Sequence, residues 1–189
     1  ELNKWNIDFA AWCGYKYLNG GPGAPSGIYV NKKFHDYDLN RFEGWWGHDK
    51  KTRFDPPNLF NPIKGAEAWQ LSNPPILSMA ALRSSLELFN EVGMNALRNK
   101  SIKLTSYMEM MIKSLNNKNI SIITPSEKNN RGSHLSLKIN SINNNIEQSL
   151  KSKNIVCDFR KPDVIRAAPC AFYNSYIDVY KFVNTLNKL

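Results

Sequence analysis

Histidine and cysteine are scarce in this sequence of 189 residues, which contains three of each. The histidines, His35, His48 and His134, form no H-x-x-H or H-E-x-x-H pair, and the cysteines form no C-x-x-C pair. Zinc-type sites need ligands at such spacings, so we expect no metal ion. An odd number of distant cysteines also argues against a disulfide framework and favours a reducing compartment, the cytoplasm.

Long apolar segments are missing as well. No run of about 18 apolar residues occurs, so we expect no membrane-spanning helix. The first residues, ELNKWNIDFAAW, lack the basic start and apolar core of a signal peptide. The glycines follow neither the P-loop spacing nor the G-x-S-x-G spacing of a nucleophile elbow, which removes two common classes of catalytic motif.

Positive charge is in excess, with 25 Lys and Arg against 16 Asp and Glu, a net charge of +9. A basic surface can bind nucleic acid or an anionic substrate, or it can simply keep a protein soluble. The lysines are scattered among asparagines, and no basic stripe with interleaved aromatics occurs. We therefore expect no nucleic-acid partner, although a basic binding fragment without catalytic activity remains an alternative.

The chain changes character near residue 72. The part before it is rich in Gly, Pro and aromatic residues, with a short strand expected at 28–30. Pro74 and Pro75 suit the first turn of a helix, and apolar residues then recur at helical spacing. A second helical pattern follows Gly93. Its apolar face comprises Leu104, Met108, Met111, Ile112 and Leu115. We place a domain boundary here, between 1–91 and 92–189.

The rest of the chain alternates short strands and helices. ISIITP, HLSLKI, VCDFR and VIRAAP read as strands, and HLSLKI places its apolar residues on one face. A short helix is expected after Asn144, a possible N-cap, and the closing helix should turn Tyr176, Val179, Val183 and Leu186 inward. The pattern predicts an α+β domain over 92–189, with an antiparallel sheet and helices on one face.

One lysine has an unusual setting in the segment WCGYKYLNGGPG. Lys16 lies between Tyr15 and Tyr17, and a glycine-rich turn follows. An amine in a partly apolar pocket has a lowered pKa and can form a Schiff base with an aldehyde or ketone. Glycines let the backbone approach a bulky ligand closely. Taken alone, the triplet is more typical of a surface lysine whose stem lies on aromatic rings.

Longer segments resemble one enzyme family. FAAWCGYKYLNGGPG, GWWGHDKKTRFD, WQLSNPPILSMAALRSSLELF, RGSHLSL and VCDFRKPDVIRAAPCAFYNSYIDVYKFV are similar, in this order, to segments of the kynureninases. The resemblance spans nearly the whole chain, and GWWGH and SNPPIL are specific to that family. It implies an α/β protein with the aspartate-aminotransferase-like fold type I. Residues 1–91 would be the C-terminal part of the large domain that binds pyridoxal 5'-phosphate, and 92–189 the small domain.

The resemblance also implies roles for individual residues. Lys16 would bond covalently to the cofactor, and Tyr15 would contact its phosphate and donate a proton near the substrate carbonyl. The other implied site residues are Trp45 and Asn73 at the cofactor, and Arg166, His48 and Ser72 at the substrate, with Arg166 binding its α-carboxylate.

Each assignment has a structural alternative. Arginine offers a bidentate fork for a carboxylate, but Arg166 could instead form an internal salt bridge. Trp45 could pack in a core, as we expect of Trp46. Asn73 could cap the helix that follows, and His48 could be an ordinary loop histidine.

The implied reaction is hydrolysis of L-kynurenine, or its 3-hydroxy form, to the corresponding anthranilate and L-alanine. The family also implies a homodimer whose active sites are shared between subunits, with Trp45 reaching the partner's cofactor. An acidic residue for the pyridine nitrogen and an aromatic that stacks on the ring would lie upstream of this sequence. We therefore expect a C-terminal part, inactive alone. Another fold type I enzyme, such as a cysteine desulfurase, is the nearest alternative.

Overall fold

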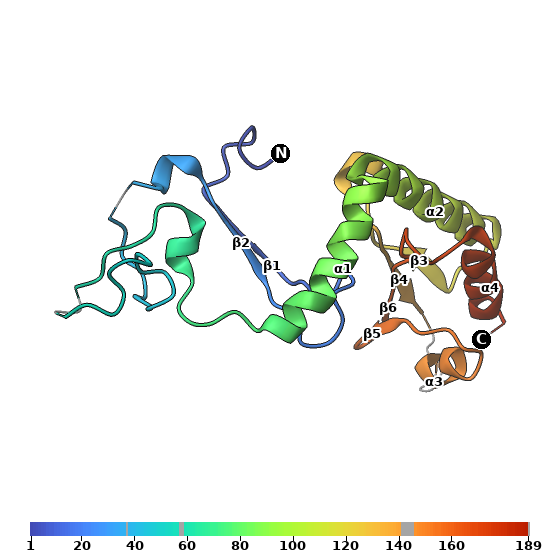
Figure 1. Cartoon of the computed structure of the whole chain (residues 1–189). Helices are drawn as coiled ribbons and strands as arrows, with labels where there is room; N and C mark the ends of the chain where they lie inside the picture. Colours follow the sequence, from blue (N-terminus) through green and yellow to red (C-terminus); the bar gives the residue numbers. More distant parts are fainter. Residues whose placement is uncertain (37, 57–58, 141–145, 189) are drawn as a thin grey trace. The chain divides into compact units, whose positions relative to one another are not determined.

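The computed structural model describes residues 1–36, 38–56, 59–140 and 146–188, which form two compact units, Glu1–Glu91 and Val92–Leu189 (Figure 1). Among the described residues after Pro75, the α-helices and strands follow in the order helix, helix, strand, strand, helix, strand, strand, helix, as the sequence predicted. Within the described ranges, no helix has both the length and the apolar character needed to cross a membrane.

The N-terminal unit contains one β-hairpin. Strand β1 (Phe9–Trp12) pairs antiparallel with β2 (Gly27–Val30), so that Phe9 faces Val30 and Trp12 faces Gly27 (Figure 1). The expected strand at 28–30 is confirmed. The 3-10 helices η1 (Lys32–Phe34) and η2 (Ala66–Trp69) interrupt the long loop that follows. Most of this unit is irregular, in keeping with its many glycines, prolines and aromatic residues.

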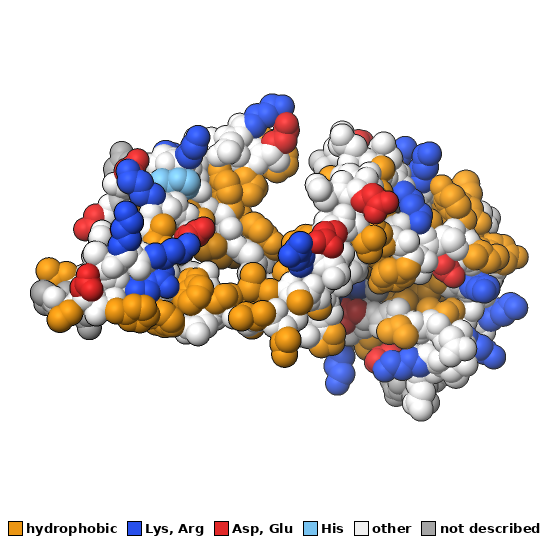
Figure 2. Space-filling view, in the orientation of Figure 1, with side chains coloured by type: hydrophobic (Ala, Val, Ile, Leu, Met, Phe, Trp, Pro, Cys, Tyr) orange, Lys and Arg blue, Asp and Glu red, His pale blue; other side chains and the backbone are white. Residues whose placement is uncertain are grey.

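Helix α1 (Ile76–Val92) ends the N-terminal unit. It begins directly after Pro75, whose carbonyl accepts a hydrogen bond from the amide of Met79. None of its residues is fully buried, and Leu77 is 89% exposed. Hydrophobic side chains therefore reach the surface along this helix (Figure 2).

The C-terminal unit is a four-stranded antiparallel sheet with helices on one face. Its strands are β3 (Ile120–Ile122), β4 (Leu135–Ile139), β5 (Asp158–Arg160) and β6 (Val164–Ala167), in the order β3-β4-β6-β5. Its helices are α2 (Met94–Ser114), α3 (Ile146–Lys151) and α4 (Tyr176–Leu186). Helices α2 and α4 pack together over the sheet (Figure 1). The predicted architecture of this unit is confirmed.

The core of this unit follows from the alternation of its strands. Leu135, Leu137 and Ile165 point to the helical side and are almost fully buried, because successive strand residues face opposite ways. Three helices complete the core with a set of apolar residues: Leu104, Met108, Ile112, Ile146, Leu150, Val179, Phe182, Val183 and Leu186.

Tyr176 was predicted to face inward, but it is 48% exposed and packs edge-on against the Tyr107 ring; Phe182, a turn and a half later, is buried in the core. The N-cap predicted at Asn144 lies outside the described residues.

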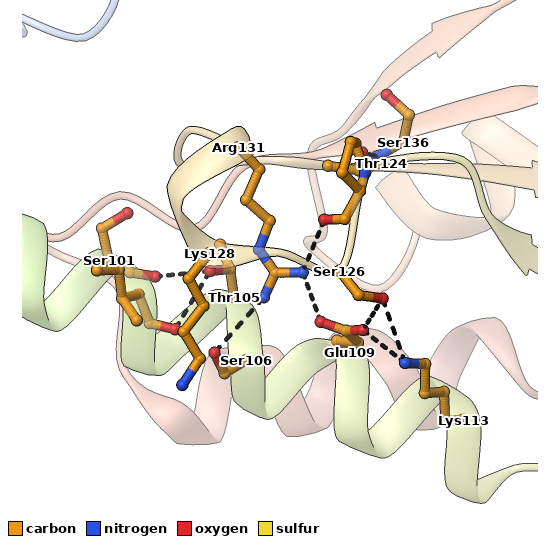
Figure 3. A network of polar contacts seen from close by, with 12 residues as sticks. Ser101, Thr105, Ser106, Glu109, Lys113, Thr124, Ser126, Lys128, Arg131 and Ser136 are labelled. Carbon is orange, nitrogen blue, oxygen red and sulfur yellow. Dashed lines mark hydrogen bonds and ion pairs between the residues drawn. The ribbon is translucent and has the colours of Figure 1, made fainter.

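A buried ion pair ties α2 to the loop before β4. Arg131 donates from Nη1 to Oε2 of Glu109 at 2.5 Å, and the side chain of Arg131 is only 2% exposed (Figure 3). Glu109 also accepts hydrogen bonds from Lys113 and Ser126, each at 2.6 Å. Burial by itself raises the pKa of Glu109, but these three donors outweigh it and lower the pKa to about 2.

Candidate functional site

The segment around Lys16 forms a compact loop between β1 and β2. The amide of Asn19 donates to the carbonyl of Lys16, and the amide of Gly20 donates to the carbonyl of Gly14, each at 3.0 Å. Asn19 has a φ of 54°, in the left-handed region that asparagine tolerates better than most residues. These bonds fix the backbone on both sides of the lysine.

Two glycines make this loop possible. A Cβ on Gly14 would lie 2.2 Å from the carbonyl oxygen of Pro25, and one on Gly20 would lie 2.8 Å from the Cβ of Ala24. Side chains at either position would therefore clash with the returning chain. The Leu82 side chain of α1 lies against both glycines, which places the loop on that helix.

The side chain of Lys16 is exposed in this structure. Its Nζ lies 5.4 Å from the centre of the Tyr15 ring, and no ion pair of Lys16 occurs among the described residues. The exposed amine matches the surface lysine, with its stem on an aromatic ring, that the Tyr-Lys-Tyr triplet indicates when taken alone. The amine is free to bond to a ligand.

The GWWGH segment forms a second loop, held together by an arginine. The Trp45 and Trp46 rings meet edge to face with centres 5.2 Å apart, and the guanidinium of Arg53 lies 5.5 and 5.2 Å from them. Arg53 also donates from Nη2 to the carbonyls of Trp46 and His48, at 3.1 and 3.0 Å. Trp45 remains 42% exposed, so its indole N–H is not confined to a core.

His48 is the most buried of the expected site residues, at 9% exposure. The amide of Asn61 donates to its Nδ1 at 3.3 Å, which requires an unprotonated Nδ1. Nε2 therefore carries the proton of the neutral ring and donates it to Oγ1 of Thr52 at 3.0 Å. Both ring nitrogens are used inside the loop, which fits the ordinary loop histidine as well as a pocket wall.

Ser72 and Asn73 are exposed just before α1. The carbonyl of Ser72 accepts a hydrogen bond from the Gln70 side chain at 2.9 Å. Both side chains are accessible to a ligand.

Arg166 belongs to the C-terminal unit, in the middle of β6. Its side chain is on the sheet face opposite the core, where Ser136 on β4 and Asp158 on β5 are its cross-strand partners. Asp158 accepts hydrogen bonds from Arg166 and, at 2.8 Å, from Arg160. The internal salt bridge considered from the sequence is therefore present.

The charge of Asp158 is stabilised by these neighbours. Loss of water around the carboxylate raises its pKa, but hydrogen bonds from Arg160 and Arg166, together with their charges, outweigh this effect, and the pKa lies below its ordinary 3.8. Asp158 thus remains a carboxylate at neutral pH. Neither Asp158 nor Arg53 was expected at the site from the sequence.

The structure groups the expected residues as follows. Tyr15 and Lys16 share one loop, and Trp45 and His48 share another. Ser72 and Asn73 adjoin α1, and Arg166 lies in the other unit. In the described part of the chain, no group of three or more His, Cys, Asp or Glu side chains is placed to hold a metal ion.

Comparison with protein-family models gives one match. Residues 97–186 match the kynureninase C-terminal domain. This range begins within α2 and covers nearly all that follows, including the strand that carries Arg166.

Similar proteins extend the match over the whole chain. The kynureninase of Myxococcus xanthus is 54% identical over 187 residues, which are 98% of this chain and 44% of that protein. The kynureninase of Koribacter versatilis is 48% identical over 184 residues, 97% of this chain and 43% of that protein. The chain thus spans less than half the length of the relatives that it matches.

Solved structures show the same fold at low identity. A cysteine desulfurase from Thermococcus onnurineus matches 99% of the chain and 48% of its own with a TM-score of 0.75 and 17% identity. An alanine–glyoxylate aminotransferase from Nostoc matches 99% of the chain and 49% of its own with a TM-score of 0.65 and 19% identity. The predicted fold type I class is confirmed.

The identities separate the family from its rivals of the same fold. Desulfurase structures share 15–17% of residues with this chain, whereas kynureninases share 42–54%. The sequence motifs, the domain match and these relatives agree, and the chain corresponds to the C-terminal portion of the kynureninases.

Proposed function

We propose that the full-length protein carrying this chain hydrolyses the Cβ–Cγ bond of L-kynurenine or 3-hydroxykynurenine, giving the corresponding anthranilate and L-alanine with pyridoxal 5'-phosphate as cofactor. The observation that carries the proposal is the identity of 45–54% to several kynureninases over nearly the whole chain. Because the chain spans about 44% of their length, the activity is proposed for the complete protein.

The residues present fit this cofactor. An aldehyde needs an accessible amine, and the exposed Lys16 provides one on a loop fixed by two main-chain hydrogen bonds. Gly14 and Gly20 let that loop close against Pro25, Ala24 and Leu82, which holds its backbone on both sides of the lysine. Trp45 is 42% exposed, and its indole N–H is a donor suited to a phosphate oxygen.

Lys16 and Tyr15 would carry the proton transfers. When bound, pyridoxal phosphate supplies an electron sink for the carbanions of this reaction. Nζ of Lys16, once released, would accept the proton from the substrate Cα, and Oη of Tyr15 would donate a proton near the substrate carbonyl. Their adjacency on one rigid loop keeps both groups at the same ligand.

The remaining residues would bind and orient. Asn73 would contact the cofactor, and Ser72 beside it the substrate. Arg166 would hold the substrate α-carboxylate, so that the Cα–H bond faces Lys16. The buried His48 ring would form a wall for the aromatic amine, with its nitrogens held by Thr52 and Asn61. We propose a cytoplasmic homodimer in which Trp45 completes the partner's site.

The test is a turnover assay on the full-length protein with added cofactor. We expect release of fluorescent anthranilate from L-kynurenine, and loss of that release in Lys16→Arg but not in Lys50→Arg, a conservative change at an exposed lysine of another loop. Sulfide release from L-cysteine without anthranilate formation would favour the desulfurase alternative. Normal turnover in Lys16→Arg would refute the role of this lysine.

A further inference from the structure

The ion pair between β5 and β6 has a specific geometry. Nε of Arg166 donates to one oxygen, Oδ2, of Asp158, and Nη2 of Arg166 forms an ion pair with the same oxygen. The two residues are direct cross-strand partners in the sheet, so their backbones hold the side chains opposite each other. Nε of Arg160, two residues from Asp158, donates to the same oxygen at 2.8 Å.

This arrangement uses one edge of the guanidinium. Arginine has five N–H donors in a plane, and it can grip a carboxylate through the edge that carries Nε and Nη2 or through the edge that carries Nη1 and Nη2. Asp158 takes the first edge. Among the described residues, no hydrogen bond or ion pair involves Nη1 of Arg166, so the second edge is open for a ligand.

The charges of the cluster also favour one further anion. Arg160 and Arg166 contribute two positive charges, and Asp158 contributes one negative charge, which leaves a net charge of +1. The Arg166 side chain is 40% exposed, so its second edge can be reached from solvent. A single carboxylate would neutralise the cluster.

We propose that Asp158 is a positioning residue, which occupies the Nε edge of Arg166 and thereby directs the substrate carboxylate to the Nη1–Nη2 edge. The inference rests on the proposed role of Arg166 in carboxylate binding. In this arrangement the ligand does not displace Asp158. Asp158 fixes the plane of the guanidinium to which the ligand binds. A guanidinium held in one plane loses less conformational entropy when it binds a carboxylate than a mobile one does.

The test follows the arginine N–H resonances of the 189-residue chain by NMR during titration with sodium acetate, against sodium chloride at equal ionic strength. Arg166→Lys assigns the signals. We expect acetate to shift the Nη resonances of Arg166 and to leave its Nε–H resonance in place. A shift of Nε–H in the unaltered chain would mean that acetate replaces Asp158, and would overturn the proposal without any variant.

Two variants sharpen the comparison. In Asp158→Asn the Nε edge loses its charged acceptor, and we expect acetate to shift Nε–H as well. Asp163→Asn is the matched control, because Asp163 lies in the same hairpin but pairs with Lys138 at 3.7 Å. It removes the same charge and should behave like the unaltered chain. If acetate leaves the Nε–H resonance in place in Asp158→Asn as well, the positioning role of Asp158 is contradicted.

A different result would refute the proposed binding of the substrate carboxylate by Arg166. If acetate shifts no Arg166 resonance in any of these proteins, Arg166 does not bind carboxylates, and its proposed place in the substrate site falls together with this inference. If acetate binds but displaces Asp158, the substrate role stands and only the positioning role is lost.

Discussion

Ser85, on the third turn of α1, donates its hydroxyl proton to the main-chain carbonyl of Leu18 at 2.6 Å. The two residues are 67 positions apart, and the bond joins the helix to the loop that carries Lys16. A helix backbone is among the most rigid supports in a protein, so a loop bound to it keeps its lysine in one place. The geometry proposed for proton transfer depends on such support.

Ser85→Ala should loosen the Lys16 loop. It leaves the Leu18 carbonyl without its donor, a loss on the order of 1 kcal/mol. We expect the amides of Asn19 and Gly20, which close the loop, to exchange with deuterium about fivefold faster, by hydrogen exchange read by NMR. Ser84→Ala is the control, since the Ser84 hydroxyl donates to the Ala80 carbonyl within the helix. Equal exchange in both variants would contradict the support role.

Gly14→Ala should destabilise the N-terminal unit. The added methyl group would meet the Pro25 carbonyl oxygen at 2.2 Å, and backbone there has little room to yield. Overpacking of this kind costs about 1–3 kcal/mol. Urea unfolding followed by tryptophan fluorescence measures it, because all five tryptophans lie in this unit, and Ser84→Ala, at an exposed position of the same unit, is the control. An unchanged midpoint in Gly14→Ala would show that the loop can rearrange.

Arg53→Lys should disorder the GWWGH loop despite keeping the charge. A lysine has one ammonium and no planar fork, so it cannot both lie against the Trp45 and Trp46 rings and bond two carbonyls. We expect a loss of near-UV circular dichroism from the tryptophan pair. Lys51→Arg, at an exposed neighbouring position, should leave that signal unchanged. A full signal in Arg53→Lys would show that the aromatic contacts alone hold the loop.

The C-terminal unit was largely predictable from the sequence because its patterns are local. Alternation of Leu135, Leu137 and Ile139 fixes the buried face of β4 without knowledge of any partner. The same parity places Arg166, between the buried Ile165 and Ala167, on the opposite face. For β4 and β6, the spacing of the apolar residues alone thus predicted both the strand and its buried face.

The pairings at the candidate site were not predictable in this way. That Asp158 faces Arg166 depends on the register of β5 on β6, which no short motif encodes. Arg53 reaches the Trp46 and His48 carbonyls only because an irregular loop folds back on itself. The exposure of Lys16 likewise depends on which segments surround it in space, and not on its neighbours in sequence.

Glu109→Gln should weaken the C-terminal unit strongly. It removes the negative charge beside Arg131, whose side chain is 2% exposed, and an unpaired buried charge costs about 3 kcal/mol or more. Urea unfolding followed by the amide resonances of α2 and β4 measures the loss. Glu147→Gln is the control, because the Glu147–Lys151 pair is about half exposed and worth less than about 0.5 kcal/mol. Similar losses in both variants would contradict a special role for the buried pair.

The same pair should make the C-terminal unit sensitive to acid. In the folded chain the pKa of Glu109 is about 2, below the 4.5 of an unperturbed glutamate, so the unfolded state binds its proton first. The stabilisation is complete above about pH 5.5 and is lost as the pH falls from 4.5 towards 2. Unfolding free energies measured between pH 6 and pH 2.5 should therefore fall more steeply in the unaltered chain than in Glu109→Gln. Parallel curves would show that other carboxylates, such as Asp158, cause the acid sensitivity.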